Sequence, residues 1–334
     1  MTRPRFAAVL LAATALSACS APEPSISERS FSAFGTITTV QLIEPDAGRR
    51  ERAHAAVEAR FRELERDWRS FGPGELGQVN ARLARGERAR LSPPLQALVA
   101  RSLEIKERSG GLFDPRVGSL VALWGFQDLG EKTPDTAPDA ATIDALRTAS
   151  IARAELRLDG EELVTTAPVT LELAGIAKGA ALTAGRETLI AAGIKAALIT
   201  IGGDVIALGQ HGSRPWRVGV KDPRGAGTLG AIDLADGEAA LSSGNYERQF
   251  PTPTGRAHHI IDPRTGRPTT GVAGVTVVSH DAALANAAAV ALMVGEVADL
   301  ERLATTLGIG TALQVSVDGS LMQTGAMQRR LLPL

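Results

Sequence analysis

The sequence predicts an α+β fold in which helices pack on mixed, largely antiparallel sheets within a single compact domain. Strand and helix patterns follow one another without the strict alternation of a doubly wound fold. Hairpin signals, such as Asp159-Gly160 between two short apolar runs, are frequent and favour antiparallel pairing. Residues 31–334 contain no clear linker, which favours one domain over two.

Composition narrows the classes of function. The 334 residues are 44% hydrophobic and 22% charged, which is an ordinary globular balance in a chain long enough to bury a sizeable core. The formal net charge is −1, so no basic excess points to nucleic acid. Cys19 is the only cysteine, which excludes a disulfide within the chain.

The first 30 residues predict export and a membrane anchor. Two arginines precede an apolar run, residues 7–15, that is too short to span a bilayer as a mature helix. The run leads into Leu16-Ser-Ala-Cys19, which is similar to the bacterial lipobox, where the cysteine is lipidated and becomes the first residue. The alternative is a plain signal peptide in which Cys19 occurs by chance. We expect a lipoprotein signal peptide over residues 1–18, a tether over 19–30 and the folded domain over 31–334.

The first half of the domain is expected to be mainly helical. Residues 34–43 alternate like a strand, and apolar side chains recurring every three or four residues predict a helix over residues 49–71. Residues 70–80 are expected to form a loop. Ser92-Pro93 predicts the start of a second helix, which ends at Gly110-Gly111. A short helix over 141–147 and a hairpin over 156–165 follow.

The central stretch, residues 171–208, organises the rest of the chain. Residues 169–173 alternate apolar with polar and predict a half-buried strand. The glycines of Gly175-Ile-Ala-Lys-Gly179 predict a sharp turn, followed by a helix over residues 180–192. A strand over 196–201 then ends in Gly202-Gly-Asp204. A lysine and free N–H groups at a helix N-terminus favour an anion. The alternative is a surface lysine beside an ordinary turn.

The last third alternates strands with two helices. Strands are expected over residues 216–220, 239–246 and 275–279, and near the paired histidines at 258–259. The stretch 282–294 is almost entirely apolar and predicts a buried helix, followed by an amphipathic helix over 296–307 and a final hairpin over 311–323.

Six short segments share one character, since each is rich in glycine, carries one or two polar residues and lies at a predicted strand end. Such turns gather on one rim of a sheet and converge on a ligand. They are residues 34–36, 109–120, 175–179, 201–204, 242–248 and 258–266.

The ordered set of segments, together with the lipobox, resembles the ApbE family of FAD:protein FMN transferases. The resemblance covers the chain from Phe34 to the last hairpin. It implies that FAD binds in an extended cleft with Mg²⁺ at its pyrophosphate. FMN then moves to a threonine or serine hydroxyl of a partner protein, and AMP leaves. The implied partner is a redox membrane protein carrying Asp-x-x-Ser/Thr-Gly-Ala-Ser/Thr, on the periplasmic side of a bacterial membrane.

The resemblance also implies a set of site residues. Lys178 would neutralise phosphate charge, and His259 would accept a proton or contact phosphate. Neighbouring side chains on a strand point to opposite faces, so only one of His258 and His259 faces the cleft. The implied FAD-binding residues are Phe34, Phe71, Asp114, Lys178, Gly203, Asp204, Ser243, Gly244, Tyr246 and Thr265.

Structural alternatives stay open for several of these residues. Phe34 and Phe71 either stack on the flavin ring or pack in the core. Asp114 either binds the flavin or caps its own turn. His259 is either the proton acceptor or a hydrogen-bonded structural histidine, while Asp262 is expected to fix a turn.

The implied metal site departs from the family pattern. The resemblance assigns it the Ala177 carbonyl, Asn286 and Val290, but the family has aspartate and threonine at the last two positions. Mg²⁺ prefers anionic oxygen, which asparagine and valine do not offer. The chain therefore binds Mg²⁺ poorly, uses water and Asp281, or has lost catalysis. Glu172 likewise stands where the family has aspartate.

Two further functions remain as alternatives to the transferase. An FAD pyrophosphatase would use water in place of the hydroxyl and release FMN and AMP. A catalytically weakened FAD-binding lipoprotein would hold FAD without cleaving it, as the two departures at the metal positions suggest.

Overall fold

The computed structural model describes residues 25–127, 136–252 and 255–333. The predicted signal peptide, the lipidation site Cys19 and the first part of the predicted tether lie outside the described residues. Within the described ranges, no helix is both long and apolar enough to span a bilayer.

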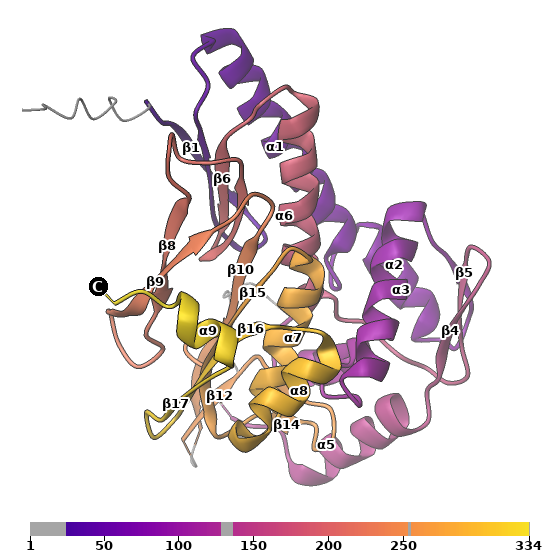
Figure 1. Cartoon of the computed structure of the whole chain (residues 1–334). Coiled ribbons are helices and arrows are strands. Elements are labelled where there is room, and N and C mark those ends of the chain that lie inside the picture. The colour runs from indigo at the N-terminus through magenta and orange to yellow at the C-terminus, as the bar shows by residue number, and fades with distance from the viewer. Residues whose placement is uncertain (1–24, 128–135, 253–254, 334) are drawn as a thin grey trace, which may run out of the picture.

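An eight-stranded sheet lies at the centre of the molecule (Figure 1), and every neighbouring pair of its strands is antiparallel. This confirms the predicted antiparallel pairing. From one edge to the other the strands are β1 (Ser27–Ala33), β2 (Thr36–Leu42), β6 (Ala197–Ile201), β7 (Asp204–Leu208), β10 (Ala239–Gly244), β15 (Val272–Ser279), β16 (Thr311–Ser316) and β17 (Leu321–Gln323).

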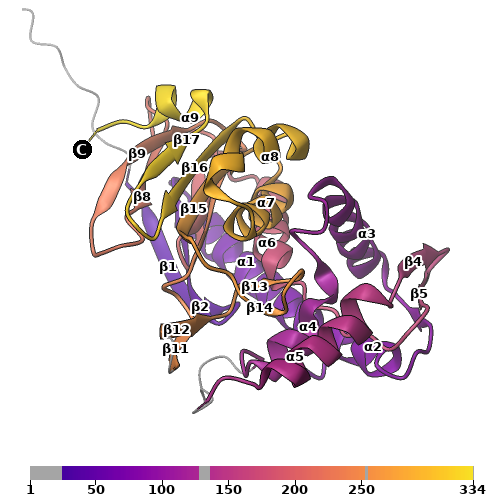
Figure 2. The same ribbon diagram turned by 90° about the horizontal axis from the view of Figure 1, so that it is seen from below.

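Helices α6 (Ala174–Ala191) and α7 (Ala282–Val294) lie against the sheet, and α1 (Ala47–Trp68) packs on α6 (Figures 1 and 2). Nearly every side chain of α7 is buried, as its apolar sequence predicts. A second core, which includes Trp216 and Met327, forms where the hairpin of β8 (Trp216–Lys221) and β9 (Thr228–Leu234) and helix α9 (Gly325–Arg330) pack on residues of the central sheet, such as Val205 and Leu313.

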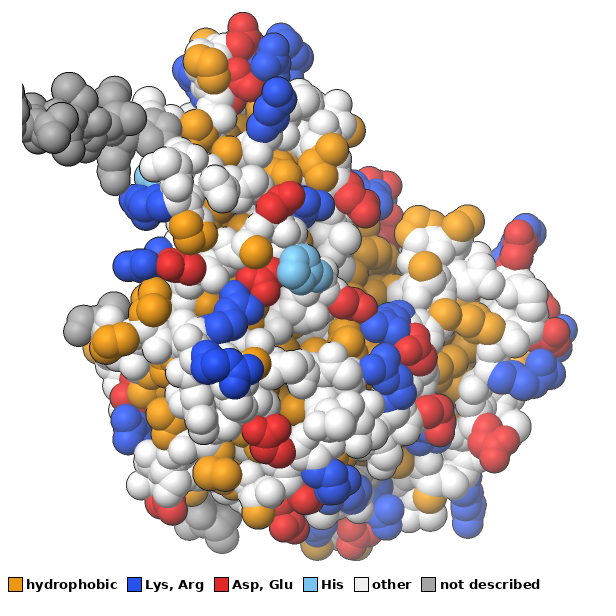
Figure 3. Space-filling view, viewed as in Figure 1, with side chains coloured by type: hydrophobic (Ala, Val, Ile, Leu, Met, Phe, Trp, Pro, Cys, Tyr) orange, Lys and Arg blue, Asp and Glu red, His pale blue; other side chains and the backbone are white. Residues whose placement is uncertain are grey.

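The remaining elements form a lobe beside this assembly and small hairpins below it (Figure 2). The lobe holds α2 (Glu75–Leu83), α3 (Pro93–Arg108), α4 (Gly118–Leu123), α5 (Ala140–Arg147) and a small sheet of β3 (Ala89–Arg90), β5 (Glu162–Thr165) and β4 (Leu156–Asp159). Two hairpins pair β11 (Gln249–Thr252) with β12 (Gly255–His258) and β13 (Ile261–Asp262) with β14 (Arg267–Pro268), and α8 (Leu300–Leu307) precedes β16. Figure 3 shows positive and negative side chains interspersed over one face.

The predicted sharp turn at residues 175–179 is wrong, because these residues lie inside α6, which begins at Ala174. Gly179 instead permits a close approach of helices. A Cβ placed there would lie 2.1 Å from the carbonyl oxygen of Ala282 at the start of α7. Because only glycine fits at such a distance, the glycine spacing reflects the α6–α7 contact and not a turn.

The predicted strand over residues 169–173 is also wrong, although its alternating burial is present. The segment is extended, but it pairs with a side chain and not with another strand. Asn80 donates from Nδ2 to the Leu171 carbonyl at 2.9 Å and accepts from the Leu171 N–H at 2.8 Å. The Val169 N–H donates to the Leu83 carbonyl and the Glu172 N–H to the Pro115 carbonyl, so a buried amide and carbonyls outside any strand together replace a partner strand.

Two further boundaries need correction. β1 begins at Ser27, so residues 27–30 form an edge strand and not part of a tether. Their side chains are polar and alternate between half-buried and exposed, a pattern without the apolar signal of a strand. Helix α2 begins at Glu75 within the predicted loop, since Leu76, Val79 and Leu83 form a buried stripe at helical spacing.

Candidate functional site

A cavity of about 620 Å³ opens between the β1–β2 turn, the end of α1, the start of α6, the β6–β7 turn, β8 and the segment after β10. Its size lies within the range of about 300–1,000 Å³ usual for ligand sites. A smaller cavity of about 90 Å³ adjoins it and shares Phe126, Glu172, Ala174 and Arg248 as wall residues. All six of the turn-rich segments singled out in the sequence contribute residues to the walls of these two cavities.

The β1–β2 turn brings Phe34 to the wall of the large cavity. Phe34 and Gly35 have φ of 54° and 69°, as a two-residue hairpin turn requires, so residues 34–35 are not part of the predicted strand. The ring of Phe34 meets that of Phe61 edge-on, with 5.9 Å between centroids. Phe71 lines the same cavity while it packs on the apolar cluster around Trp124. Both phenylalanines therefore combine core packing with an apolar face toward the cavity.

Lys178 lies on the cavity wall and forms an ion pair with Asp204, whose side chain is 2% exposed. The other carboxylate oxygen of Asp204 accepts from the Ser242 N–H at 2.8 Å. Burial alone would lower the pKa of Lys178, but the carboxylates of Asp204 and Glu247 outweigh burial and raise it. The lysine therefore stays charged, and its interpretation as an ordinary surface lysine is wrong.

The β10 segment brings Tyr246 to the cavity. A Cβ at Gly244 would lie 2.1 Å from the Tyr246 ring, so glycine lets the ring lie against the strand. Burial, with Glu247 and Asp204, raises the pKa of Tyr246 to about 12, so the phenol keeps its proton. Gly203, with φ of 107°, lines the same cavity in the β6–β7 turn. Ser243 is buried on β10 but does not line the large cavity, whereas Ser242 does.

The two adjacent histidines have different environments. His258 is held by the Thr269 carbonyl, 2.8 Å from Nε2, and is structural. His259 lines the small cavity, and its Nδ1 is buried without a hydrogen-bond partner among the described residues. Burial lowers the pKa of His259 to about 3, helped by Arg248, His258 and Lys178. His259 is therefore neutral and able to accept a proton at Nδ1.

We expect the free energy of unfolding to fall as pH decreases from about 6.5 to about 3. His259 has a pKa of about 3 when folded and about 6.5 when unfolded. The unfolded chain binds more protons in this interval, which favours unfolding. At pH 5 this histidine alone lowers the free energy of unfolding by about 2 kcal/mol. Urea titrations at pH 7 and pH 5 measure the loss.

The matched variants for this prediction are His259→Gln and His280→Gln. The first removes the buried imidazole and is expected to lose less stability between pH 7 and pH 5 than the parent protein. The second changes an exposed histidine and keeps the parent's pH dependence. Equal pH dependence in all three proteins would contradict a buried, neutral His259.

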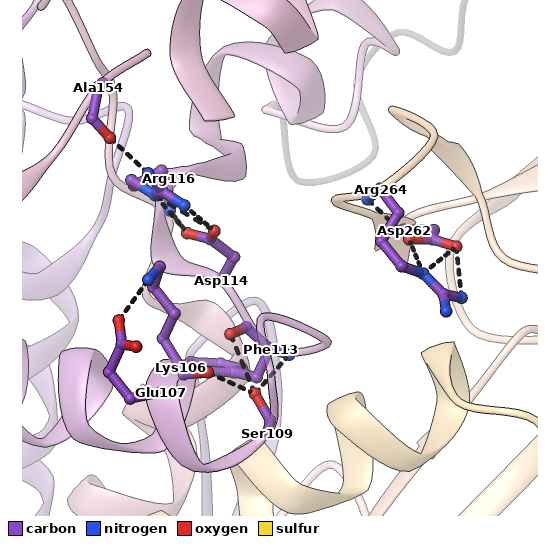
Figure 4. Close-up of polar contacts among 9 residues, drawn as sticks. All are labelled: Lys106, Glu107, Ser109, Phe113, Asp114, Arg116, Ala154, Asp262 and Arg264. Carbon is purple, nitrogen blue, oxygen red and sulfur yellow. Dashed lines mark hydrogen bonds and ion pairs between the residues drawn. The ribbon is translucent and has the colours of Figure 1, made fainter. Parts of the chain in front are cut away.

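Two predicted site regions form self-contained turns. Asp114 caps its own turn by accepting from the Arg116 N–H at 2.9 Å, and the Arg116 guanidinium pairs with it at 2.5 Å. Asp262 likewise accepts from the Arg264 N–H at 2.8 Å and pairs with the Arg264 guanidinium at 2.9 Å (Figure 4). Asp114 lines the small cavity, yet both its oxygens are occupied. Thr265 is exposed in the β13–β14 turn and lines neither cavity.

The residues at the family's metal positions do not fit Mg²⁺. Asn286 is 2% exposed, and its Oδ1 accepts from the Gly179 N–H at 3.2 Å. Val290 lies in the wall of the small cavity and offers no oxygen, while Ala177 lines the large one. Asp281 is also engaged, because it caps α7 and pairs with Arg101 at 2.6 Å. The described residues contain no group of three His, Cys, Asp or Glu side chains suited to a metal.

Sequence reasoning missed six charged residues on the wall of the large cavity, of which Glu65 and Arg69 lie in the last turn of α1 and directly after it. Glu247 and Arg248 directly follow Tyr246 in the segment 242–248, so the motif itself was the available signal. Glu172 was noticed only because the family has aspartate at this position. Burial raises the pKa of its carboxyl, although hydrogen bonds from Ala174 and Ser70 act in the opposite direction. Lys221 ends β8, and no local pattern marks it.

The fold and cavities define an α+β protein with a large cavity lined by aromatic and charged side chains. A family model described as the ApbE family matches residues 34–313. The chain belongs to the ApbE family.

Individual relatives agree with this membership. The chain is 42% identical over 332 residues to a FAD:protein FMN transferase of Rhodobacter capsulatus, covering 98% of this chain and 62% of that protein. It is 34% identical over 215 residues to a FAD:protein FMN transferase of Treponema pallidum (strain Nichols), covering 60% and 59% of the two chains. The matches thus span less than two thirds of these two relatives' lengths.

Solved structures share the fold across nearly their whole length. The ApbE protein of Thermotoga maritima superposes with a TM-score of 0.84 at 26% identity, covering 92% of this chain and 99% of that one. The apo flavinyl transferase ApbE of Pseudomonas stutzeri gives a TM-score of 0.80 at 27% identity, covering 92% and 98%.

Proposed function

We propose that this chain is a FAD:protein FMN transferase, which moves FMN from FAD to a threonine or serine hydroxyl of a partner protein and releases AMP. The observation that carries the proposal is the convergence of all six turn-rich segments on two adjoining cavities. Their walls combine aromatic rings with lysine and arginine cations, which suits a ligand with a flavin ring and a pyrophosphate. Membership of the ApbE family supports the same function.

The transfer exchanges the phosphoanhydride bond of the FAD pyrophosphate for a phosphate ester bond to the acceptor. The hydroxyl oxygen of the acceptor bonds to the phosphorus of the FMN half. The bond from that phosphorus to the bridging oxygen breaks, and AMP leaves with this oxygen. The hydroxyl proton passes to the free Nδ1 of His259. Negative charge bound nearby favours protonated imidazole and so raises the pKa of His259 from its low value in the empty protein.

The cationic side chains of the cavity would stabilise the phosphates. Asp204 holds Lys178 in place and keeps it charged. A positive charge that is already oriented toward the transferring phosphoryl group lowers the activation barrier of the transfer, because it stabilises the negative charge of the transition state. Since Asn286 and Val290 do not fit Mg²⁺, no step of this proposal passes through a metal ion.

One observation favours a second candidate, a flavin-binding protein with weakened catalysis. Asn286 supplies no charge, and its side-chain oxygen is occupied by Gly179. If phosphoryl transfer needs a metal at this position, FAD would bind without being cleaved.

We expect AMP release coupled to labelling of the acceptor. The protein lacking residues 1–18 is incubated with FAD, Mg²⁺ and a small domain bearing the Asp-x-x-Ser/Thr-Gly-Ala-Ser/Thr motif. Chromatography measures AMP, and mass spectrometry measures the acceptor, which gains FMN less one water. An acceptor with valine in place of its acceptor threonine is the control and stays unlabelled.

The other outcomes separate the alternatives. AMP and FMN without a labelled acceptor would indicate a pyrophosphatase. Bound FAD with neither product would identify the weakened flavin binder. Either result would contradict the transferase for this acceptor class.

We also propose that the chain is anchored by lipid at Cys19 on the periplasmic side of a bacterial membrane. Support comes from Arg3, Arg5, the apolar run and the lipobox-like sequence. This location suits an acceptor that is a membrane redox protein. Metabolic labelling with a palmitate analogue, compared with a Cys19→Ala variant, tests the anchor.

A further inference from the structure

Lys221 stands out among the wall residues that the proposed mechanism has not used. It ends β8, and Gly219 two residues earlier lines the same cavity. The pairing of β8 with β9 shifts register here, because Val220 pairs with Gly230 and Lys221 with Thr228, so the extra residue of the bulge is Leu229 on β9. A bulge increases the local twist of a strand pair, and Gly219 leaves the wall beside the lysine without a side chain of its own. This strand end therefore presents a cation beside open space.

The carboxylate that follows Lys221 in the chain does not pair with it. Asp222, the next residue, is taken by Arg224, whose Nη2 lies 2.8 Å from its Oδ2. Within the described parts of the chain Lys221 forms no ion pair, in contrast to Lys178 with Asp204. Its Nζ lies 4.0 Å from the centre of the Tyr246 ring, a contact that positions the ammonium without neutralising it.

The two lysines belong to the same part of the cavity. Burial raises the pKa of Glu247, and both Lys178 and Lys221 oppose this rise, so both ammonium groups lie near that carboxylate. Glu247 lines the wall of the same cavity as both lysines. Two lysines near one carboxylate on this wall form a site whose positive charge suits an anion with two phosphates.

We propose that Lys221, together with Lys178, binds the pyrophosphate of a flavin dinucleotide and makes the cavity selective for FAD over flavins without phosphate. The inference rests on the proposed function, which makes FAD the ligand. An ammonium group binds phosphate as a point charge, so its role depends on charge more than on side-chain shape. The lysine pair also supplies positive charge near the phosphates. A metal ion would supply such charge, but Asn286 and Val290 do not fit one.

The test measures ligand affinity and not turnover. FAD, ADP and riboflavin are titrated against the protein lacking residues 1–18 in the presence of a chelator. Isothermal calorimetry follows ADP, and flavin fluorescence follows the other two ligands. Lys221→Gln is expected to weaken FAD and ADP by roughly tenfold, the usual size of one charge-assisted contact, and to leave riboflavin unchanged. Lys221→Arg keeps the charge and is expected to retain most of the affinity.

Two control variants frame the result. Lys195→Gln removes an exposed lysine that lines neither cavity and should bind all three ligands like the parent. Arg69→Gln removes another cation of the large cavity. A selective loss of FAD and ADP in Arg69→Gln but not in Lys221→Gln would overturn the assignment to Lys221.

The remaining outcomes are equally decisive. Equal affinities of parent and Lys221→Gln for FAD would overturn the inference and leave the proposed function standing. An equal loss for FAD and riboflavin would show that Lys221 shapes the cavity and does not bind pyrophosphate. Failure of the parent protein to bind FAD at all would overturn the proposed function itself.

Discussion

Replacing His259 with asparagine is expected to lower the rate of FMN transfer by about 10²–10⁴-fold while FAD stays bound, because positioned proton acceptors contribute about this much to catalysis. His259 lines the small cavity that adjoins the large one, and its Nδ1 is buried without a hydrogen-bond partner in the described part of the chain. Asparagine fills part of the same space but cannot take up a proton. Single-turnover labelling of the acceptor, with FAD fluorescence as the measure of binding, separates the two effects.

The matched control is His280→Asn, which changes an exposed histidine away from both cavities. It is expected to transfer FMN at the parent rate. A parent-like rate in His259→Asn would rule out this histidine as the proton acceptor. A loss of FAD binding in proportion to the loss of rate would give His259 a binding role in its place.

Changing Gly179 to alanine is expected to destabilise the protein by about 3 kcal/mol, at the upper end of the usual cost of overpacking. Within a helix, alanine is ordinarily more favourable than glycine by about 1 kcal/mol. Here the added methyl group would lie 2.1 Å from the Ala282 carbonyl oxygen, so α6 and α7 must move apart. The packing cost therefore exceeds the gain in helix propensity. Urea unfolding followed by circular dichroism measures the difference.

Gly225 offers the same substitution without the clash. It lies in the loop after β8, and a Cβ there has no neighbour within 4 Å. Gly225→Ala is expected to change the free energy of unfolding by less than about 0.5 kcal/mol. If both variants were equally stable, the close α6–α7 contact would be refuted.

The elements predicted best are those whose pattern is local and strong. The apolar run at residues 282–294 coincides with α7, and the hairpin at the end of the chain coincides with β16 and β17. Elements were missed where tertiary contacts decide the outcome. Gly179 is a packing residue, and the extended segment around Leu171 finds its partner in a side chain 91 residues away.

The same distinction applies to the site. Lys178 and Tyr246 lie in turn-rich motifs that sequence alone could identify, and the structure brings both to one cavity. Lys221 has no such marker, because its importance depends on a bulge in the β8–β9 pair and on the ring of Tyr246 in the turn after β10. Thr265 had a marker but lies in an exposed turn away from the cavities.

The Asp-Pro-Arg sequence occurs at residues 114–116, 222–224 and 262–264, and in each case the arginine closes on its own aspartate. Each turn is thus electrically neutral, because the positive charge of its arginine is balanced by the negative charge of its own aspartate. The first and third turns line the small cavity and the second directly follows Lys221, yet neutral pairs of this kind add little to the electrostatic potential inside the cavities. That potential is set by a few side chains on the wall, so the ionic-strength dependence of ligand binding should report on those side chains alone.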